Sequence, residues 1–79
     1  MSPTVMRIGP YRFFFNSREE TRKHVHVASA GGTAKFWLDP VVALESYHGL
    51  SPRDLRDVDQ LVREHEDEFR SAWDRHFSS

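Results

Sequence analysis

Cysteine is absent from this chain of 79 residues, which excludes a disulfide framework and a thiolate metal site. Glycine and proline occur only four times each, and we find no low-complexity linker. No apolar run approaches the roughly 20 residues that span a bilayer. The first residues lack the apolar segment of a secretion signal. We therefore expect a soluble, cytoplasmic protein with no membrane contact.

The length of the chain and the distribution of its charges further limit the kinds of protein that it can be. We expect residues 1–79 to form a single small domain. The net charge of −1 is unevenly distributed: residues 1–39 hold six Lys and Arg against three acids, and residues 40–79 hold five against nine. A basic first half is compatible with a side that faces a polyanion. Ordinary solvated surface charge gives the same imbalance.

Short apolar runs in the first half predict β-strands, bounded by Gly9-Pro10, by Ser29–Gly32 and by Asp39-Pro40. The four expected strands are Val5–Ile8, Tyr11–Phe15, His24–Ala28 and Thr33–Leu38. We expect residues 41–47 to form a short helical turn.

The last two strands can be placed in register from their side chains. A loop over residues 29–32 opposes Val25 to Phe36 and His26 to Lys35. Opposed residues share a face of the sheet. One face then carries Val25, Val27, Ala34, Phe36 and Leu38, and the other carries His24, His26, Lys35 and Trp37. A slip of one residue would mix the two sets.

The second half predicts a long amphipathic helix. Ser51 suits the N-cap, Pro52 the first helical position and Asp54 the first turn. Apolar residues then recur three or four apart as far as Phe77. We predict an α+β fold: a small antiparallel sheet of about four strands in residues 1–39, packed against one long C-terminal helix over residues 51–77.

The lengths of these elements differ. A helix of about 25 residues spans about 37 Å, whereas a strand of about six residues spans about 20 Å. We therefore expect the helix to extend beyond the sheet and Phe69, Trp73 and Phe77 to contact a partner or a second copy of the chain. The alternative is that the N-terminal strands or the Val41–Leu44 segment cover these three side chains.

The polar face of the sheet is the candidate site. His26 beside Lys35 suits a general base next to a cation that stabilises a phosphate, with His24 as a second proton carrier. Trp37 can stack a base, and Arg12 can join the same face together with Phe14. The catalytic candidates are therefore His24, His26 and Lys35, and the nucleic-acid-binding candidates are Arg12 and Trp37. Ordinary polar residues on an open sheet face are the alternative interpretation.

Metal binding is a further alternative. Two histidines separated by one residue on a strand can bind zinc, nickel or iron, but a metal needs at least a third ligand. The nearest candidates, His65, Glu66 and Glu68, are expected on the helix and hence on the other side of the sheet. We assign no metal ligand and no cofactor.

The chain resembles the DUF4160 family of short bacterial proteins. The resemblance is carried by Arg7–Phe15, His24–Val27, Ala34–Pro40 and the ending Phe69–Phe77 with Trp73. Lys23 departs from the pattern, since many relatives have proline before the His-Val-His-Val run. Such proteins often form one half of two-gene modules beside a DUF2442-type protein, which implies a toxin–antitoxin-like role and such a protein as the partner. The family carries no catalytic residue to transfer.

Beside metal binding through His24 and His26, two classes of function remain. The first is a component of a toxin–antitoxin-like module that binds RNA, or cuts it as a ribonuclease-like toxin, through the histidine-bearing sheet face. The second is a non-enzymatic interaction or dimerisation module that uses the amphipathic helix.

Overall fold

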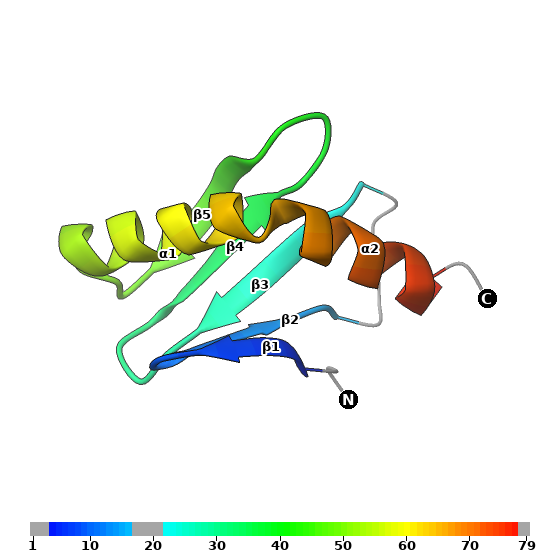
Figure 1. Cartoon of the computed structure of the whole chain (residues 1–79). Coiled ribbons are helices and arrows are strands. Elements are labelled where there is room, and N and C mark those ends of the chain that lie inside the picture. Colours follow the sequence, from blue (N-terminus) through cyan, green and yellow to red (C-terminus); the bar gives the residue numbers. More distant parts are fainter. Residues whose placement is uncertain (1–3, 17–21, 78–79) are drawn as a thin grey trace.

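Five strands form one antiparallel sheet in which each strand pairs with its neighbours in sequence. The computed structural model describes residues 4–16 and 22–77. The strands are β1 (Thr4–Ile8), β2 (Tyr11–Phe14), β3 (His24–Ala28), β4 (Thr33–Trp37) and β5 (Ala43–His48). The helices α1 (Pro52–Glu64) and α2 (Glu66–Phe77) then cross one face of the sheet (Figure 1). The predicted α+β class is confirmed.

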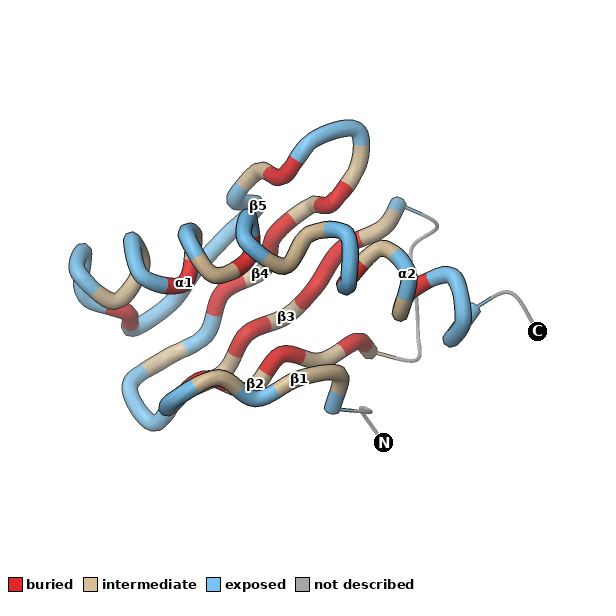
Figure 2. Tube along the Cα trace, in the orientation of Figure 1, coloured by how far each residue is buried: buried red, intermediate tan, exposed pale blue. Residues whose placement is uncertain are grey.

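The core lies between that face and the inner sides of the helices. Alternate strand positions are buried, as the successive red segments of β2, β3 and β4 show in Figure 2. The helices contribute Val58, Val62, Phe69 and Trp73. The side chains that are 0 % exposed are Phe13, Val25, Val27, Phe36, Leu38, Val58, Val62 and Phe69. Since the helices cover only one face, the side chains between these strand positions point to the opposite face.

The predicted register of β3 and β4 is confirmed. His24 lies opposite Trp37, Val25 opposite Phe36 and His26 opposite Lys35. The segregation of apolar side chains determined this pairing, because a slip would bury the histidine and lysine side chains under the helices. The Arg12–Phe14 part of β2 adds to β3 on the other side, with Phe14 opposite His26.

The expected helical turn at residues 41–47 is wrong, because Ala43–His48 form β5, and the sheet has five strands instead of the predicted four. This segment pairs antiparallel with β4 and satisfies the backbone groups along that edge. The turn that follows lies tightly against the β3–β4 loop: a Cβ atom on Gly32 would clash with the carbonyl oxygen of His48, and Gly49 has φ +84°. The β-structure of this weakly apolar segment therefore depends on its neighbours.

Each edge strand carries a β-bulge. Val5 is the extra residue of β1 between the pairs Thr4–Phe14 and Met6–Phe13. Glu45 is the extra residue of β5, because Ser46 lies opposite Lys35 and Leu44 lies opposite Phe36. Bulges and charges at an edge oppose the addition of further strands. The bulge in β5 also places Leu44 and Tyr47 on the same, helix-covered side of the sheet.

The prediction of one long helix is also wrong, since α1 ends at Glu64 and α2 begins at Glu66. Ser51 caps α1 as predicted, accepting a hydrogen bond from the Asp54 amide at 3.1 Å. The break falls at His65, whose backbone has φ −114° and ψ 18° and whose ring Nδ1 lies 2.6 Å from a Glu68 carboxylate oxygen. The acidic residues 66–68 thereby occupy the first turn of α2, where the helix dipole favours them. Neither described helix is long and apolar enough to cross a membrane.

The expectation that the distal end of the helix extends beyond the sheet is wrong for Phe69 and Trp73. Phe69 is 0 % exposed and packs on Phe13 with ring centroids 5.2 Å apart. Trp73 is 6 % exposed and meets Phe15 edge-on at 5.3 Å. The N-terminal strands thus cover the distal helix, and of the three residues only Phe77 is exposed, at 37 %.

Arg70 fixes α2 to the end of β4. Its guanidinium donates two hydrogen bonds to the Leu38 carbonyl oxygen, at 3.0 and 2.7 Å, and pairs with Glu66 at 2.6 Å. The hydrogen bond that Arg70 donates to the Glu66 carboxylate raises the pKa of Arg70. These contacts hold the second helix against the sheet on which its own aromatic residues pack.

Candidate nucleic-acid interface

The candidate site lies on the face of the sheet that no helix covers. Side chains from three adjacent strands reach it at alternate positions: Arg12 and Phe14 from β2, His26 from β3, and Lys35 and Trp37 from β4. All are partly exposed. We call these five residues, with Arg22, the open-face cluster. It contains four of the five residues predicted to contact nucleic acid or to act on it there.

Within the open-face cluster, cations lie over aromatic rings. The Arg12 guanidinium carbon is 4.5 Å from the centroid of the Phe14 ring. The Lys35 ammonium is 4.6 Å, and the Arg22 guanidinium carbon 4.2 Å, from the Trp37 ring. Such contacts contribute about 0.5–1 kcal/mol each at exposed sites. The cluster therefore combines positive charge with flat ring surfaces.

Hydrogen bonds orient both arginines of the cluster. Arg12 Nε donates to the Thr4 hydroxyl at 2.8 Å. Arg22 Nε donates to the carbonyl oxygen of Asp39 at 2.9 Å, so the loop after β4 holds this guanidinium over Trp37. In each arginine the hydrogen bond donated by Nε holds the guanidinium over an aromatic ring, that of Phe14 for Arg12 and that of Trp37 for Arg22.

His26 stacks on Phe14, with ring centroids 5.3 Å apart and an angle of 20° between the rings. Its Nε2 lies 3.2 Å from the side-chain nitrogen of Asn16. Lys35 lies directly opposite His26 on β4. The predicted neighbourhood of His26 and Lys35 is therefore present, and Asn16 is an additional polar contact of the histidine.

His24 differs from the prediction that it shares the open face. It is only 1 % exposed, although it lies opposite Trp37 in the sheet. Its ring contacts His26 at 5.1 Å and Trp73 of α2 at 4.9 Å, and its Nδ1 donates to the Arg22 carbonyl oxygen at 2.8 Å. Alternation could not predict this burial, because it results from the packing of α2 over the start of β3.

Lys23 lies beside this site without joining it. Its ammonium forms an ion pair with Asp74 of α2 at 2.8 Å, and this hydrogen bond raises the pKa of Lys23. Lys23, the residue before β3, thus connects the strand to the helix layer.

A shallow groove of about 410 Å³ crosses the open face. Its polar lining includes Asn16, His26, Lys35 and His48, and Phe14 forms part of its apolar wall. Phosphate oxygens and base edges suit such a mixture of donors and rings. Among residues 4–16 and 22–77, no group of three or more histidine, aspartate or glutamate side chains could hold a metal ion.

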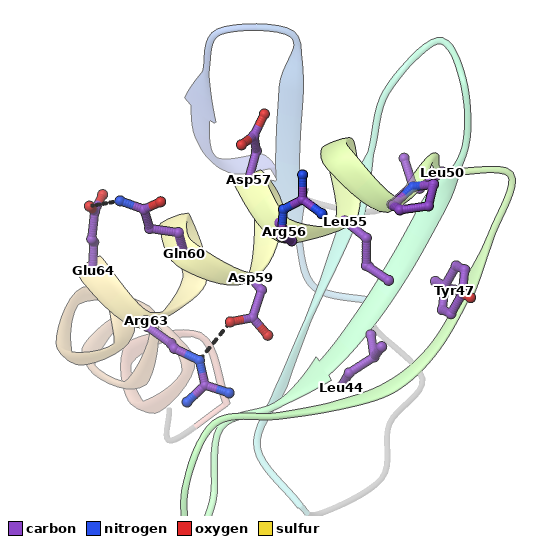
Figure 3. A pocket seen from close by; sticks show the side chains of 11 residues that line it. Leu44, Tyr47, Leu50, Leu55, Arg56, Asp57, Asp59, Gln60, Arg63 and Glu64 are labelled. Carbon is purple, nitrogen blue, oxygen red and sulfur yellow. Dashed lines mark hydrogen bonds and ion pairs between the residues drawn. The ribbon is translucent and has the colours of Figure 1, made fainter.

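A second groove, of about 880 Å³, lies between β5 and α1 on the helix-covered side. Leu44, Tyr47, Leu50 and Leu55 project toward one another there (Figure 3). The ion pair between Arg63 and Asp59, at 2.7 Å, flanks them on the helix. The sequence did not predict this groove, because residues 41–47 were expected to be helical.

The comparisons with known proteins identify the family. A model of the domain of unknown function DUF4160 matches residues 11–74. The chain belongs to the DUF4160 family. This match spans β2 to most of α2 and includes every residue of the open-face cluster. Neither the curated proteins nor the solved structures contain a significant match to this DUF4160 chain.

Proposed function

We propose that this DUF4160 protein binds single-stranded RNA on the open face of its sheet. The observation that carries the proposal is the open-face cluster, in which three cations lie over two aromatic rings on a helix-free surface. Proteins that bind single strands combine a basic surface with rings on which bases stack. Eight of the nine acidic residues of the second half of the chain lie in the helices, on the opposite side of the sheet, where they do not oppose a polyanion at this face.

Binding would exchange one set of contacts for another. Each cation–ring contact is worth about 0.5–1 kcal/mol, whereas a base stacked on an aromatic side chain is worth about 1–3 kcal/mol. In this exchange a base takes the place of the Lys35 ammonium on the Trp37 ring, and the ammonium contacts a neighbouring phosphate. The cations thus occupy the ring faces until a base replaces them.

The test is a titration of labelled single-stranded RNA at low salt, followed by fluorescence anisotropy. Trp37→Ala should weaken binding about 5- to 150-fold, the equivalent of one stacked base. Lys35→Ala should reduce the slope of log K against log salt by about 0.7, the value for one phosphate contact with a single strand.

The matched control is Arg53→Ala, which removes an exposed cation from α1 in the helix layer. It should change the affinity far less than Trp37→Ala. Equal affinities for the wild-type chain and the Trp37→Ala and Lys35→Ala variants would refute RNA binding at this face.

The family resemblance supports a role for this RNA-binding surface in a toxin–antitoxin-like module in the cytoplasm. Co-expression with a DUF2442-type protein tests that role: the pair should copurify, and expression of one member should relieve a growth defect caused by the other. Two proteins that purify separately and have no effect on growth would contradict it.

A second candidate function is protein interaction at the groove between β5 and α1. Leu44 is 37 % and Tyr47 54 % exposed there, an unusual position for large apolar side chains. Leu55→Asp should then abolish self-association or binding of the DUF2442-type protein while RNA affinity stays unchanged. A variant that assembles like the wild type would reject this groove as the interface.

A further inference from the structure

The groove between β5 and α1 is bordered by apolar side chains that remain exposed to solvent. Leu44 and Tyr47 form its β5 wall, and Leu55 of α1 projects toward them from the other wall (Figure 3). We propose that this groove is the interface of a symmetric dimer, in which the Tyr47 ring of each copy enters the groove of the other. The proposal rests on the second candidate function, protein interaction at this groove, and names the partner as a second copy of the chain.

The bulge in β5 creates the apolar wall of the groove. Residues three apart on a regular strand point to opposite faces of the sheet. Because Glu45 is the extra residue, Leu44 and Tyr47 instead lie on the same face. Among the described residues, four large apolar side chains are exposed, and three of them, Val41, Leu44 and Tyr47, lie in this one segment. Since the bulge opposes strand pairing at this edge, the two copies meet through these side chains.

A two-fold axis requires a surface that is complementary to itself. If one residue contacts another residue of the second copy, the same contact occurs a second time with the roles exchanged. An axis that crosses β5 between Glu45 and Ser46 runs the two strands in opposite directions and brings Leu44 opposite Tyr47 of the second copy. The hollow of about 880 Å³ then receives a tyrosine ring, a side chain that often anchors protein interfaces.

The charges of α1 are complementary in the same antiparallel arrangement. Arg56 and Asp57 precede Gln60 by four and three residues, and Arg63 and Glu64 follow it by three and four. All five residues are exposed and line the groove. Two copies of the helix related by an axis at Gln60 therefore place Arg56 opposite Glu64 and Asp57 opposite Arg63. Each pair of opposite charges occurs twice.

Arg56 is the charge on which this pairing is best tested. No hydrogen bond or ion pair connects its guanidinium to another residue of ranges 4–16 and 22–77. Arg63, in contrast, already pairs with Asp59 of its own chain at 2.7 Å. Arg56 and Glu64 are eight residues apart, or about 12 Å along the helix. A contact between these two side chains therefore forms between copies of the chain and not within one.

The first measurement is sedimentation equilibrium of the full chain over a range of protein concentrations. The wild-type chain should approach twice its monomer mass as the concentration rises. Tyr47→Asp should keep the chain monomeric with an unchanged far-ultraviolet circular dichroism spectrum, because the side chain is exposed in the single chain. A wild-type chain that stays monomeric throughout, or a Tyr47→Asp variant that dimerises like the wild type, would overturn the proposal.

Charge reversal tests the antiparallel arrangement itself. Arg56→Glu and Glu64→Arg should each weaken dimerisation by about 2- to 30-fold, which corresponds to the loss of two exposed ion pairs. The double variant should recover the wild-type affinity, because it restores both pairs with the charges exchanged. Arg7→Glu is the matched control, since it makes the same charge change on β1, at the other edge of the sheet, and should have no effect. A double variant that dimerises no better than the single variants would overturn the arrangement.

The same variants separate this inference from the function on which it rests. If the chain alone stays monomeric while Leu55→Asp abolishes binding of the DUF2442-type protein, protein interaction at the groove is supported and the second copy is rejected as its partner. If the chain stays monomeric and this protein does not bind either, both statements are rejected. Neither outcome depends on RNA binding at the open face.

Discussion

Phe69→Ala tests whether the second helix belongs to the core of its own chain. The side chain is 0 % exposed and packs against Phe13, with the ring centroids 5.2 Å apart. Removing a buried phenylalanine leaves a cavity and costs about 3–5 kcal/mol, which includes the loss of the ring contact. A domain of 79 residues has a total unfolding free energy of about 4–12 kcal/mol. The variant should therefore lie close to the unfolding threshold.

The assay is thermal denaturation followed by tryptophan fluorescence at two protein concentrations. At about 4–8 °C per kcal/mol for a domain of this size, the melting temperature should fall by about 12 °C or more. Phe77→Ala is the control, because Phe77 is 37 % exposed and its removal should have a small effect. If Phe69 stabilised a subunit interface instead, the loss would depend on protein concentration and the size of the particle in solution would change. A loss of stability that depends on protein concentration, or a change in particle size, would refute the burial of Phe69 within one chain.

Three further predictions concern the contacts that secure the fold. Ser51→Ala removes the side-chain acceptor of the Asp54 amide and should lower the unfolding free energy by about 1 kcal/mol in a urea titration, with Ser51→Asp as the variant that retains the cap. Arg70→Met removes both hydrogen bonds to the Leu38 carbonyl oxygen and should lower the unfolding free energy by about 1–3 kcal/mol. A loss of stability no larger than that of Arg53→Ala would contradict the role of Arg70 in fixing α2 to the end of β4. Burial, and secondarily the nearby Asp54, raises the pKa of Tyr11 in the folded chain. The neutral tyrosine should therefore contribute to the unfolding free energy. This contribution is complete below about pH 10 and is lost as the pH rises through the folded-state pKa. Denaturation curves of wild type and Tyr11→Phe from pH 8 to about pH 11 test this, and a stability difference that does not depend on pH would contradict it.

Local patterns were sufficient where neighbours in sequence determine the structure. The β3–β4 register follows from the alternation of Val25 and Val27 with histidines, because only one pairing buries all the valines. The start of α1 follows from Ser51 and Pro52, whose side chains act within a single turn. The same alternation could have identified Arg22 and Asn16 as members of the site, since Arg22 shares the spacing of the histidines and Asn16 that of Phe14.

The sequence interpretation failed where distant segments determine the outcome. Residues 43–48 form β5 because β4 has a free edge to pair with, and nothing within the segment itself indicates a strand. The burial of His24 depends on Trp73, which lies on α2 and packs over the start of β3. The break at His65 allows α2 to remain on the sheet, whereas length alone predicted an unbroken helix that extends past it.

The amino-acid pattern by itself determined the fold class, the pairing of the central strands, the cap of the first helix and the polar character of the uncovered face. These features depend on backbone geometry and on the separation of apolar from polar side chains, both of which operate over a few residues. Only the tertiary structure decided that Phe69 and Trp73 lie in the core, that His24 is buried, and that Asn16 contacts His26. Those outcomes depend on contacts between elements, because the same side chain is exposed or buried according to what packs against it.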